Sequence, residues 1–188
     1  MESRSESKER EENAIVLDYL PHGYASDHGS LKSPVAQALG VEFLTLLELI
    51  PKKEVFLQPQ QEVYIGEGKR EEIHHTKGRI SFERLTTTAK AELEHAIDEI
   101  VSDQEEKFVV FFNKAQPLSM RMHQLELLPG LGKKHMWEII DARKEKPFES
   151  FDDLKERVKL LPNPKGIVVK RIISEIKGKE KYRLFAKI

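Results

Sequence analysis

The stretch Leu127–Lys134, LLPGLGKK, decides how the C-terminal part of this chain folds. Apolar residues with helix-compatible spacing lie on both sides of it, so helices are predicted at 119–128 and 132–144. Proline cannot continue a helix, whereas Gly130 and Gly132 can adopt positive φ angles that other residues avoid. The stretch therefore predicts a tight turn between two helices.

The composition of this turn is typical of an anion-binding site. Amide groups after Gly130 are expected to point outward at the positive end of the second helix, where Lys133 and Lys134 add charge. A nucleic-acid backbone is the commonest long anion in a cell, and the plain alternative is a turn that only connects two helices. The predicted contacts are Pro129, Gly130, Leu131, Gly132, Lys133 and Lys134.

The same pattern returns later in the chain. LLPNPKGIVVKRII at 160–173 aligns with LLPGLGKKHMWEII at 127–140, at a constant offset of 33 residues. This internal repeat predicts a second turn, related to the first by approximate two-fold symmetry. Pro164 removes one amide donor, so the second turn either holds phosphate through side chains or serves only as scaffold. Its candidate contacts are Lys165, Gly166, Lys170 and Arg171.

Two resemblances follow from these residues. LLPGLGKK resembles the helix-hairpin-helix motif, whose hairpin amides hold a backbone phosphate, often with a monovalent cation. The whole chain resembles a family of uncharacterised archaeal proteins through LDYLPHGY, FLTLLELIP, FFNKA and LELLPGLGKK. The resemblance implies an α+β protein with a small OB-like antiparallel β-barrel, an all-α tandem helix-hairpin-helix domain, and a role in binding RNA. Apart from the hairpin cation, it implies no cofactor.

Residues 13–85 contain four or five short apolar runs, each bounded by Gly, Pro or polar residues. Such spacing predicts a small antiparallel barrel or sandwich. The pattern fits an SH3-like barrel as well as an OB-like one, and the resemblance favours the latter. The polar segment 69–79 is predicted to be a loop between two strands, either simply solvated or a secondary nucleic-acid contact. Its candidate residues are Lys69, Arg70, Lys77 and Arg79.

Helices are expected between the barrel and the first turn. Thr86–Thr88 offer capping hydroxyls, and apolar residues repeat at intervals of three and four over 88–101. KFVVFF at 107–112 fits a strand by propensity, but its spacing favours a helix whose phenylalanines pack inside. The predicted organisation is a disordered N-terminus at 1–12, a barrel at 13–85, a helical connector at 86–116 and a hairpin domain with a basic tail at 117–188.

Composition limits the classes of function. The 188 residues include no cysteine, which excludes disulfides and thiolate chemistry, and no apolar run reaches the ~20 residues of a membrane span. The polar N-terminus does not resemble a signal peptide, so a cytoplasmic protein is predicted. Residues 1–116 hold 14 Lys and Arg against 22 Asp and Glu, whereas residues 117–188 hold 17 against 10. The basic C-terminal part favours a polyanionic partner.

Catalytic and metal sites are not predicted. Asp152 and Asp153 follow the first turn at the distance of a base-excision glycosylase aspartate, but they lie in the first turn of a predicted helix, where carboxylates stabilise the dipole. The adjacent histidines His74 and His75 would point to opposite faces of a strand. His123 and His135 have no third metal ligand nearby in the sequence.

The sequence therefore predicts a non-catalytic nucleic-acid-binding protein, with no membrane partner and no small-molecule substrate. RNA is favoured over DNA, because OB-like modules bind single strands and the resemblance points to an archaeal protein presumed to bind RNA. Two alternatives stay open: a protein–protein adaptor that uses the helical domain, and a DNA-binding protein associated with repair or a nuclease.

Overall fold

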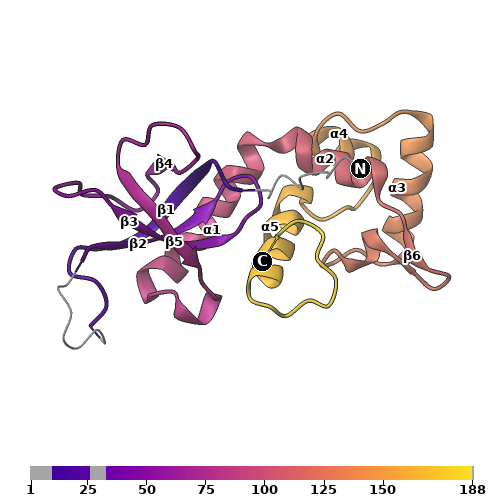
Figure 1. Ribbon diagram of the computed structural model, residues 1–188. Coiled ribbons are helices and arrows are strands. Elements are labelled where there is room, and N and C mark those ends of the chain that lie inside the picture. Colours follow the sequence, from indigo (N-terminus) through magenta and orange to yellow (C-terminus); the bar gives the residue numbers. More distant parts are fainter. Residues whose placement is uncertain (1–9, 26–32, 188) are drawn as a thin grey trace, which may run out of the picture. The chain divides into compact units, whose positions relative to one another are not determined.

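The computed structural model describes residues 10–25 and 33–187. The chain forms two compact units. The first holds the chain up to Leu93 and the C-terminal segment from Phe185, and the second is Glu94–Leu184. The architecture is α+β, with a curled antiparallel sheet in the first unit and helices dominating the second (Figure 1). In the described part of the chain, no helix is both long and apolar enough to cross a membrane.

The sheet of the first unit has five strands among the described residues. Their order is β4-β1-β2-β3-β5, all pairs are antiparallel, and β4 and β5 are the two edges (Figure 1). The strands are β1 (Asn13–Leu20), β2 (Val35–Gly40), β3 (Leu46–Pro51), β4 (Glu62–Tyr64) and β5 (Ile73–Arg79).

Irregular pairing accompanies the curl of this sheet. The register of β1 against β2 shifts between Val16 and Asp18, and that of β3 against β5 shifts between Glu48 and Leu49. Bulges of this kind bend a strand and increase its twist. Apolar side chains from all five strands then share one core, made of Ala14, Val16, Ala36, Ala38, Leu47, Leu49, Leu57, Val63, Ile65 and Ile73.

Two of the five strands were not predicted. β2 (VAQALG) has little intrinsic strand propensity, but it lies in the middle of the sheet and is buried along its whole length. β5 (IHHTKGR) occupies most of the segment predicted as a polar loop. An edge strand tolerates such polar residues, because one of its sides is open to water. The residues after Gly78 were expected to begin a strand, but they lead into the 3₁₀ helix η1 (Phe82–Arg84) instead.

A polar cluster joins the sheet to the first long helix. The side-chain amide of buried Gln37 donates to the carbonyl of Arg84 at 2.9 Å and accepts from the amide of Thr86 at 2.9 Å. Buried Glu48 accepts a hydrogen bond from Tyr24 at 2.9 Å and forms an ion pair with Lys77. Burial raises the pKa of Glu48, but the bonds and charges of its partners outweigh burial and lower it. Gln37 is therefore satisfied by hydrogen bonds inside the unit, and Glu48 by one hydrogen bond and an ion pair.

The predicted connector helices are confirmed. α1 (Thr87–Asp103) starts where the Thr86 hydroxyl accepts from the amide of Ala89 at 3.0 Å, and it continues from the first unit into the second. KFVVFF lies in α2 (Glu105–Lys114), which buries Phe108 and Phe112. α1 therefore belongs partly to each unit, because the division at Leu93 falls within it.

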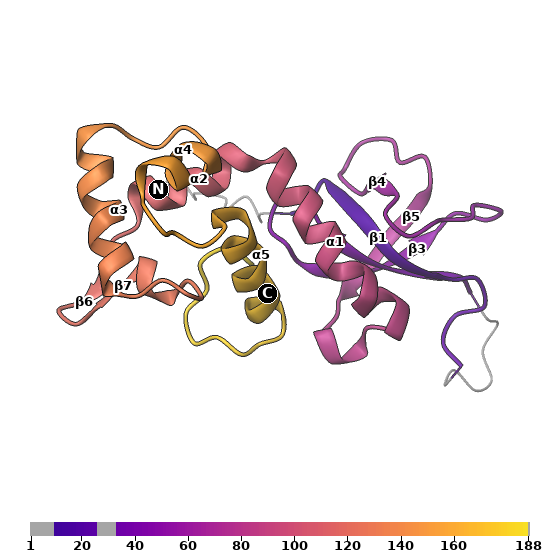
Figure 2. The ribbon, with the colours of Figure 1, turned by 180° about the vertical axis from the view of Figure 1, so that it is seen from behind.

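The second unit then continues from a small hairpin into three helices. Its elements are β6 (Pro117–Ser119), β7 (Met122–His123), the 3₁₀ helix η2 (Gln124–Leu127), α3 (Lys133–Glu145), α4 (Phe151–Arg157) and α5 (Pro164–Ile176). Both ribbon views place β6 and β7 beside one end of α3 (Figures 1 and 2). The predicted second helix of the first repeat is thus confirmed as α3.

The prediction of a helix at 119–128 was wrong, and the unit is not all-α. Ser119 pairs with Met122 across a tight reversal instead of starting a helix. The Ser119 hydroxyl accepts from the amide of Arg121 at 3.2 Å, and the Gln124 side chain accepts from the amide of Gln116 at 2.8 Å. These local bonds compete with helix formation, so only η2 remains helical before the turn.

The division at Leu93 also changes the charge balance. Residues 94–184 contain 18 Lys and Arg and 16 Asp and Glu, so the second unit carries a net charge of only +2. The basic excess counted from residue 117 onward is offset by acidic residues of α1 and α2. Net charge therefore says little about anion binding here, and local geometry must decide.

Candidate nucleic-acid interface

The turn between η2 and α3 is a type II turn. The amide of Leu131 donates to the carbonyl of Leu128 at 3.2 Å, and the two residues between them are Pro129 and Gly130. Gly130 has φ +81°, as the third position of this turn type requires. The proline and the first glycine thus have the roles predicted from the sequence.

The turn is anchored by its leucines and exposes its backbone. Leu128 and Leu131 are buried in the second unit, whereas Pro129, Gly130 and Gly132 are exposed. Leu131 is therefore a structural anchor among the predicted contacts. A broad cavity of about 800 Å³ borders the turn, and its lining includes Lys170.

The N-terminus of α3 has no internal cap. Gly132 is its N-cap residue, and the first helical hydrogen bond comes from the amide of Met136 to the carbonyl of Gly132 at 3.1 Å. Within the described residues, no acceptor bonds the amides of 132–135. These are the donors that a helix offers to a capping residue or to a ligand.

Nothing inside the fold requires a glycine at position 132. Its φ of −88° suits any residue, and a Cβ built there would meet no atom within 4 Å among the described residues. The missing side chain leaves the adjacent amides accessible from outside. The first turn of α3 also holds Lys133 and Lys134, both exposed, and no acidic residue. Positive charge there opposes the helix dipole, so this choice of residues does not favour stability.

Arg171 is a structural residue and not a surface cation. It is only 3% exposed, and its guanidinium donates to the carbonyl of Leu127 and to Glu175, both at 2.8 Å, and also to the carbonyl of Tyr182. It forms a further ion pair with Glu180 at 2.9 Å. Arg171 therefore holds the residue before the first turn against α5, and it is not available to a ligand.

The second turn is closed by its own side chains. Asn163 caps α5, because its side-chain oxygen accepts from the amide of Gly166 at 3.3 Å. Pro164 occupies the first helical position and has no amide hydrogen. Lys165 donates to Asp98 at 2.6 Å. Lys170, one turn further along α5, is exposed and borders the cavity beside the first turn.

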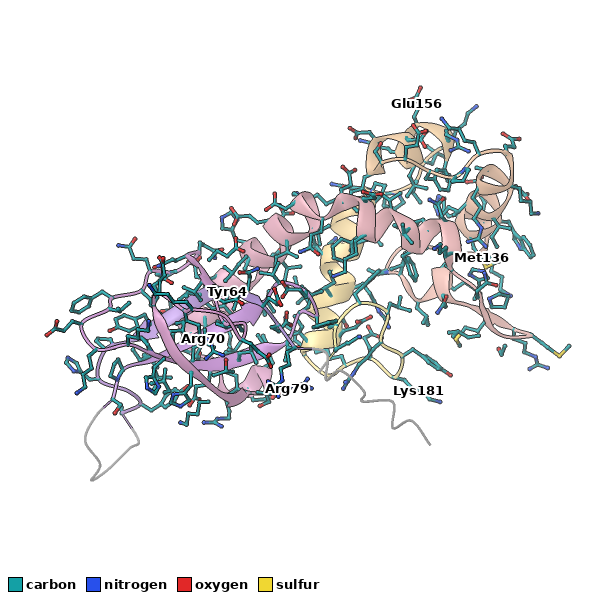
Figure 3. All side chains as sticks on the ribbon, turned by 45° about the horizontal axis from the view of Figure 1, so that its top comes forward. Tyr64, Arg70, Arg79, Met136, Glu156 and Lys181 are labelled. Atoms are coloured by element: carbon teal, nitrogen blue, oxygen red, sulfur yellow. The ribbon has the colours of Figure 1, made fainter. Side chains whose placement is uncertain are left out.

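The four candidate residues of 69–79 have different surroundings. Lys77 pairs with Glu48, while Arg70 and Arg79, both labelled in Figure 3, line a different cavity in the first unit. Lys69 is exposed and outside that cavity. The sequence did not reveal that Arg10 and Lys187 line the same cavity, because both lie more than fifty residues away along the chain.

Two of the histidines and aspartates weighed from the sequence, His123 and Asp153, have local partners. His123 caps η2, with its Nδ1 accepting from the amide of Leu125 at 3.1 Å. Burial, and then the charge of Arg143, lower the pKa of His123. Asp153 accepts from the amide of Glu149 at 3.0 Å, a bond that lowers its pKa. In the described ranges, no group of three or more His, Asp or Glu side chains could hold a metal ion.

Known proteins resemble this chain along most of its length. The family model described as "Protein of unknown function (DUF655)" matches residues 10–187. The uncharacterized protein MJ0038 of Methanocaldococcus jannaschii is 46% identical over 179 residues, which are 94% of this chain and 80% of that protein. The crystal structure of Af1531 from Archaeoglobus fulgidus has a TM-score of 0.85 and 44% identity, and the match covers 94% of this chain and 100% of that one.

Proposed function

We propose that this chain, which belongs to the DUF655 family, is a non-catalytic protein that binds the sugar-phosphate backbone of nucleic acid. In this proposal, the turn Leu128–Leu131 and the start of α3 act as a helix-hairpin-helix phosphate site. The ligands are the amides of 132–135 together with Lys133 and Lys134, and Lys170 contributes from α5.

The observation that carries the proposal is the open N-terminus of α3. Gly132 provides no cap, no atom of the described chain lies where its side chain would be, and two lysines follow it. An uncapped helix start with added positive charge costs stability in the free protein. A phosphate group bound there would satisfy the amides and the lysines together.

The sheet unit supports a single-stranded ligand. A curled five-stranded antiparallel sheet with β1 between β2 and β4 is compatible with an OB-like barrel. OB-like modules commonly bind single strands, in which backbone and bases are both accessible. We therefore assign the single-stranded form of RNA as the first ligand to test.

Fluorescence anisotropy with single- and double-stranded RNA and DNA, repeated at rising salt, tests this proposal. Affinity should fall steeply with salt, because each neutralised phosphate releases counterions. Lys133→Glu/Lys134→Glu should abolish the binding of strands whose 5′ end is a hydroxyl. The matched control is Lys155→Glu/Lys159→Glu, which makes the same charge change at exposed residues before the second turn. Equal loss in both variants, or none in either, would refute a site at the first turn.

A protein–protein adaptor is the second candidate, and one surface favours it. Large apolar side chains are exposed on the β6–β7 hairpin and on α3, where Trp137 is 58% exposed. Exposed aromatic and methionine side chains are enriched in protein interfaces. An adaptor would bind its partner with little dependence on salt, and Lys133→Glu/Lys134→Glu would leave that binding intact. The apolar residues of the hairpin are Leu118, Met120 and Met122.

A further inference from the structure

The first unit contains a cavity that the turn of the second unit does not involve. Its volume is about 430 Å³, within the range of pockets that hold small organic ligands. It is bordered by β3, by the segment after β4 and by β5. Strands β4 and β5 are the two edges of the sheet, and β3 is the neighbour of β5. The lining residues are Arg10, Glu11, Phe43, Thr45, Leu47, Ile65, Arg70, His75, Thr76, Gly78, Arg79 and Lys187.

Four cationic side chains from separate parts of the chain line this cavity, and one of them, Arg10, is paired with Glu67 at 3.2 Å. Arg70 is already oriented, because its Nε donates to the carbonyl of Gly66 at 2.7 Å and one terminal nitrogen donates to the carbonyl of His74 at 3.3 Å. Arg79 is exposed, and the described residues provide its guanidinium with no acceptor. Figure 3 labels both arginines on the sheet unit. A guanidinium can bind two oxygens of one phosphate group at once.

The one carboxylate of the lining does not cancel this charge. Glu11 is buried, and its oxygens accept from the amides of Glu42, Phe43 and Thr45 at 2.8–3.1 Å. Burial, followed by a side-chain bond with Glu42, raises its pKa. Glu11 therefore stabilises the 42–45 loop and leaves the arginines as the groups that a ligand meets.

The cavity also has apolar walls. Leu47 and Ile65 are core residues that reach its lining, and the ring of Phe43 borders it with Lys187 Nζ 4.5 Å from the ring centroid. Backbone and hydroxyl groups hold the C-terminal segment there, since the amide of Lys187 donates to the carbonyl of Phe43 at 2.9 Å. A purely inorganic anion would leave these apolar walls in water, so the walls favour a ligand with a planar or apolar body.

We propose that this cavity binds a nucleotide, with Arg70 and Arg79 holding its phosphate monoester and the walls around Phe43, Leu47 and Ile65 contacting its base. The nucleotide is either free or the phosphorylated end of a strand, since both present the same chemical group. The site is independent of the amides at the start of α3, so either site can fail without the other.

Isothermal titration of the full chain with uridine and adenosine monophosphates, the matching nucleosides and inorganic phosphate tests this site. The monophosphates should bind more tightly than either nucleosides or phosphate. Arg79→Gln should weaken them at least about tenfold, as expected for loss of a charged hydrogen-bond pair. Lys69→Gln is the matched control, because Lys69 adjoins Arg70 in sequence but lies outside the cavity. Inorganic phosphate binding as tightly as the nucleotides would overturn the proposal.

A second arm separates the two sources of the phosphate. Single-stranded RNA with a 5′-phosphate is compared with the same RNA bearing a 5′-hydroxyl, in the Lys133→Glu/Lys134→Glu background. A preference for the phosphorylated strand that Arg79→Gln removes assigns the site to strand ends. Binding of monophosphates without that preference assigns it to free nucleotides. If neither monophosphate binding nor that strand preference is observed, the nucleotide site is refuted. Loss of RNA binding by Lys133→Glu/Lys134→Glu alone tests only the site at the first turn.

Discussion

The two turns at 127–134 and 160–167 share buried apolar positions, but the backbone amides that follow them differ in accessibility. Leu128 and its repeat partner Leu161 are buried, as are Leu131 and its partner Pro164. The helix that follows the first turn starts at an uncapped glycine, whereas Asn163 caps the second. A single capping residue can thus decide whether backbone amides face a ligand or a side chain.

The two turns also differ in how strain and charge are distributed. In the first turn, the residue with positive φ is a glycine, whereas in the second it is Leu160, with φ +59° and 85% of its surface exposed. Arg171 bonds the carbonyl of Leu127, and Lys165 pairs with Asp98 at 2.6 Å. The first turn is therefore stabilised by Arg171 and remains exposed, whereas Lys165 of the second turn is paired with Asp98.

The largest expected effect comes from removing the support of the first turn. Arg171→Leu should lower the free energy of unfolding by about 3–5 kcal/mol, because it removes the cation that is ion-paired with buried Glu175. Urea denaturation measures this, with Lys170→Leu as the exposed neighbouring control. Adding Glu175→Leu to Arg171→Leu should restore part of the loss. A change below about 0.5 kcal/mol would mean that Arg171 does not support the turn.

Replacing the positive-φ residue of each turn should change the free energy of unfolding in opposite directions. Gly130→Ala should cost about 1–2 kcal/mol through backbone strain alone, since the nearest atom to the new Cβ would be Pro162 Cγ at 3.7 Å. Leu160→Gly should be neutral or stabilising by up to about 1 kcal/mol, because an exposed side chain and a strained φ are both removed. Thermal unfolding compares the two, and destabilisation by Leu160→Gly would show that the second turn needs its leucine.

Exchanging the capping residues tests the comparison most directly. Gly132→Asn should stabilise the protein by a few tenths of a kcal/mol, roughly 0.3, and weaken RNA binding, because the new side chain would occupy an amide of α3. Asn163→Gly should destabilise by a similar small amount and leave RNA binding unchanged. Chemical denaturation and anisotropy on the same samples measure both. Unchanged RNA binding by Gly132→Asn would argue against amide contacts.

The smallest expected effect depends on pH. Because burial lowers the pKa of His123 below its ordinary 6.5, its contribution to stability is complete above that value and is lost as pH falls through the lowered pKa. The protonated ring can no longer accept from the amide of Leu125. Urea midpoints at neutral and mildly acidic pH should differ less in His123→Asn, which caps without titrating. An equal difference in both proteins would assign the acid sensitivity elsewhere.

Local chemistry made several elements predictable. Thr86 and the spacing of the residues after it identified α1, and Pro129 with Gly130 identified the turn. The helix predicted around Asp152 and Asp153 is α4, and the Ser150 hydroxyl caps it by accepting from the amide of Asp153 at 3.0 Å. In each case the deciding residues lie within a few positions of one another, so their effect does not depend on the rest of the fold.

Elements that depend on distant partners were not predictable in the same way. β2 is a strand because β1 and β3 pair with it on both sides, although its own residues have little strand propensity. β6 and β7 pair where helical spacing suggested a helix. Arg79 was one candidate among several cations until the fold placed it in the lining of a cavity and paired Lys77 with Glu48.

The sequence by itself determined the family and the α+β class. It also determined the position of the first turn, because proline, glycine and repeated leucines act on the backbone locally. Only the tertiary structure decided which cations are available. Arg171 and Lys133 have equal charge in the sequence, but one is surrounded by carbonyls and carboxylates, and the other is exposed at an open helix end. Burial and pairing depend on residues far apart in the chain, and these are fixed only when it folds.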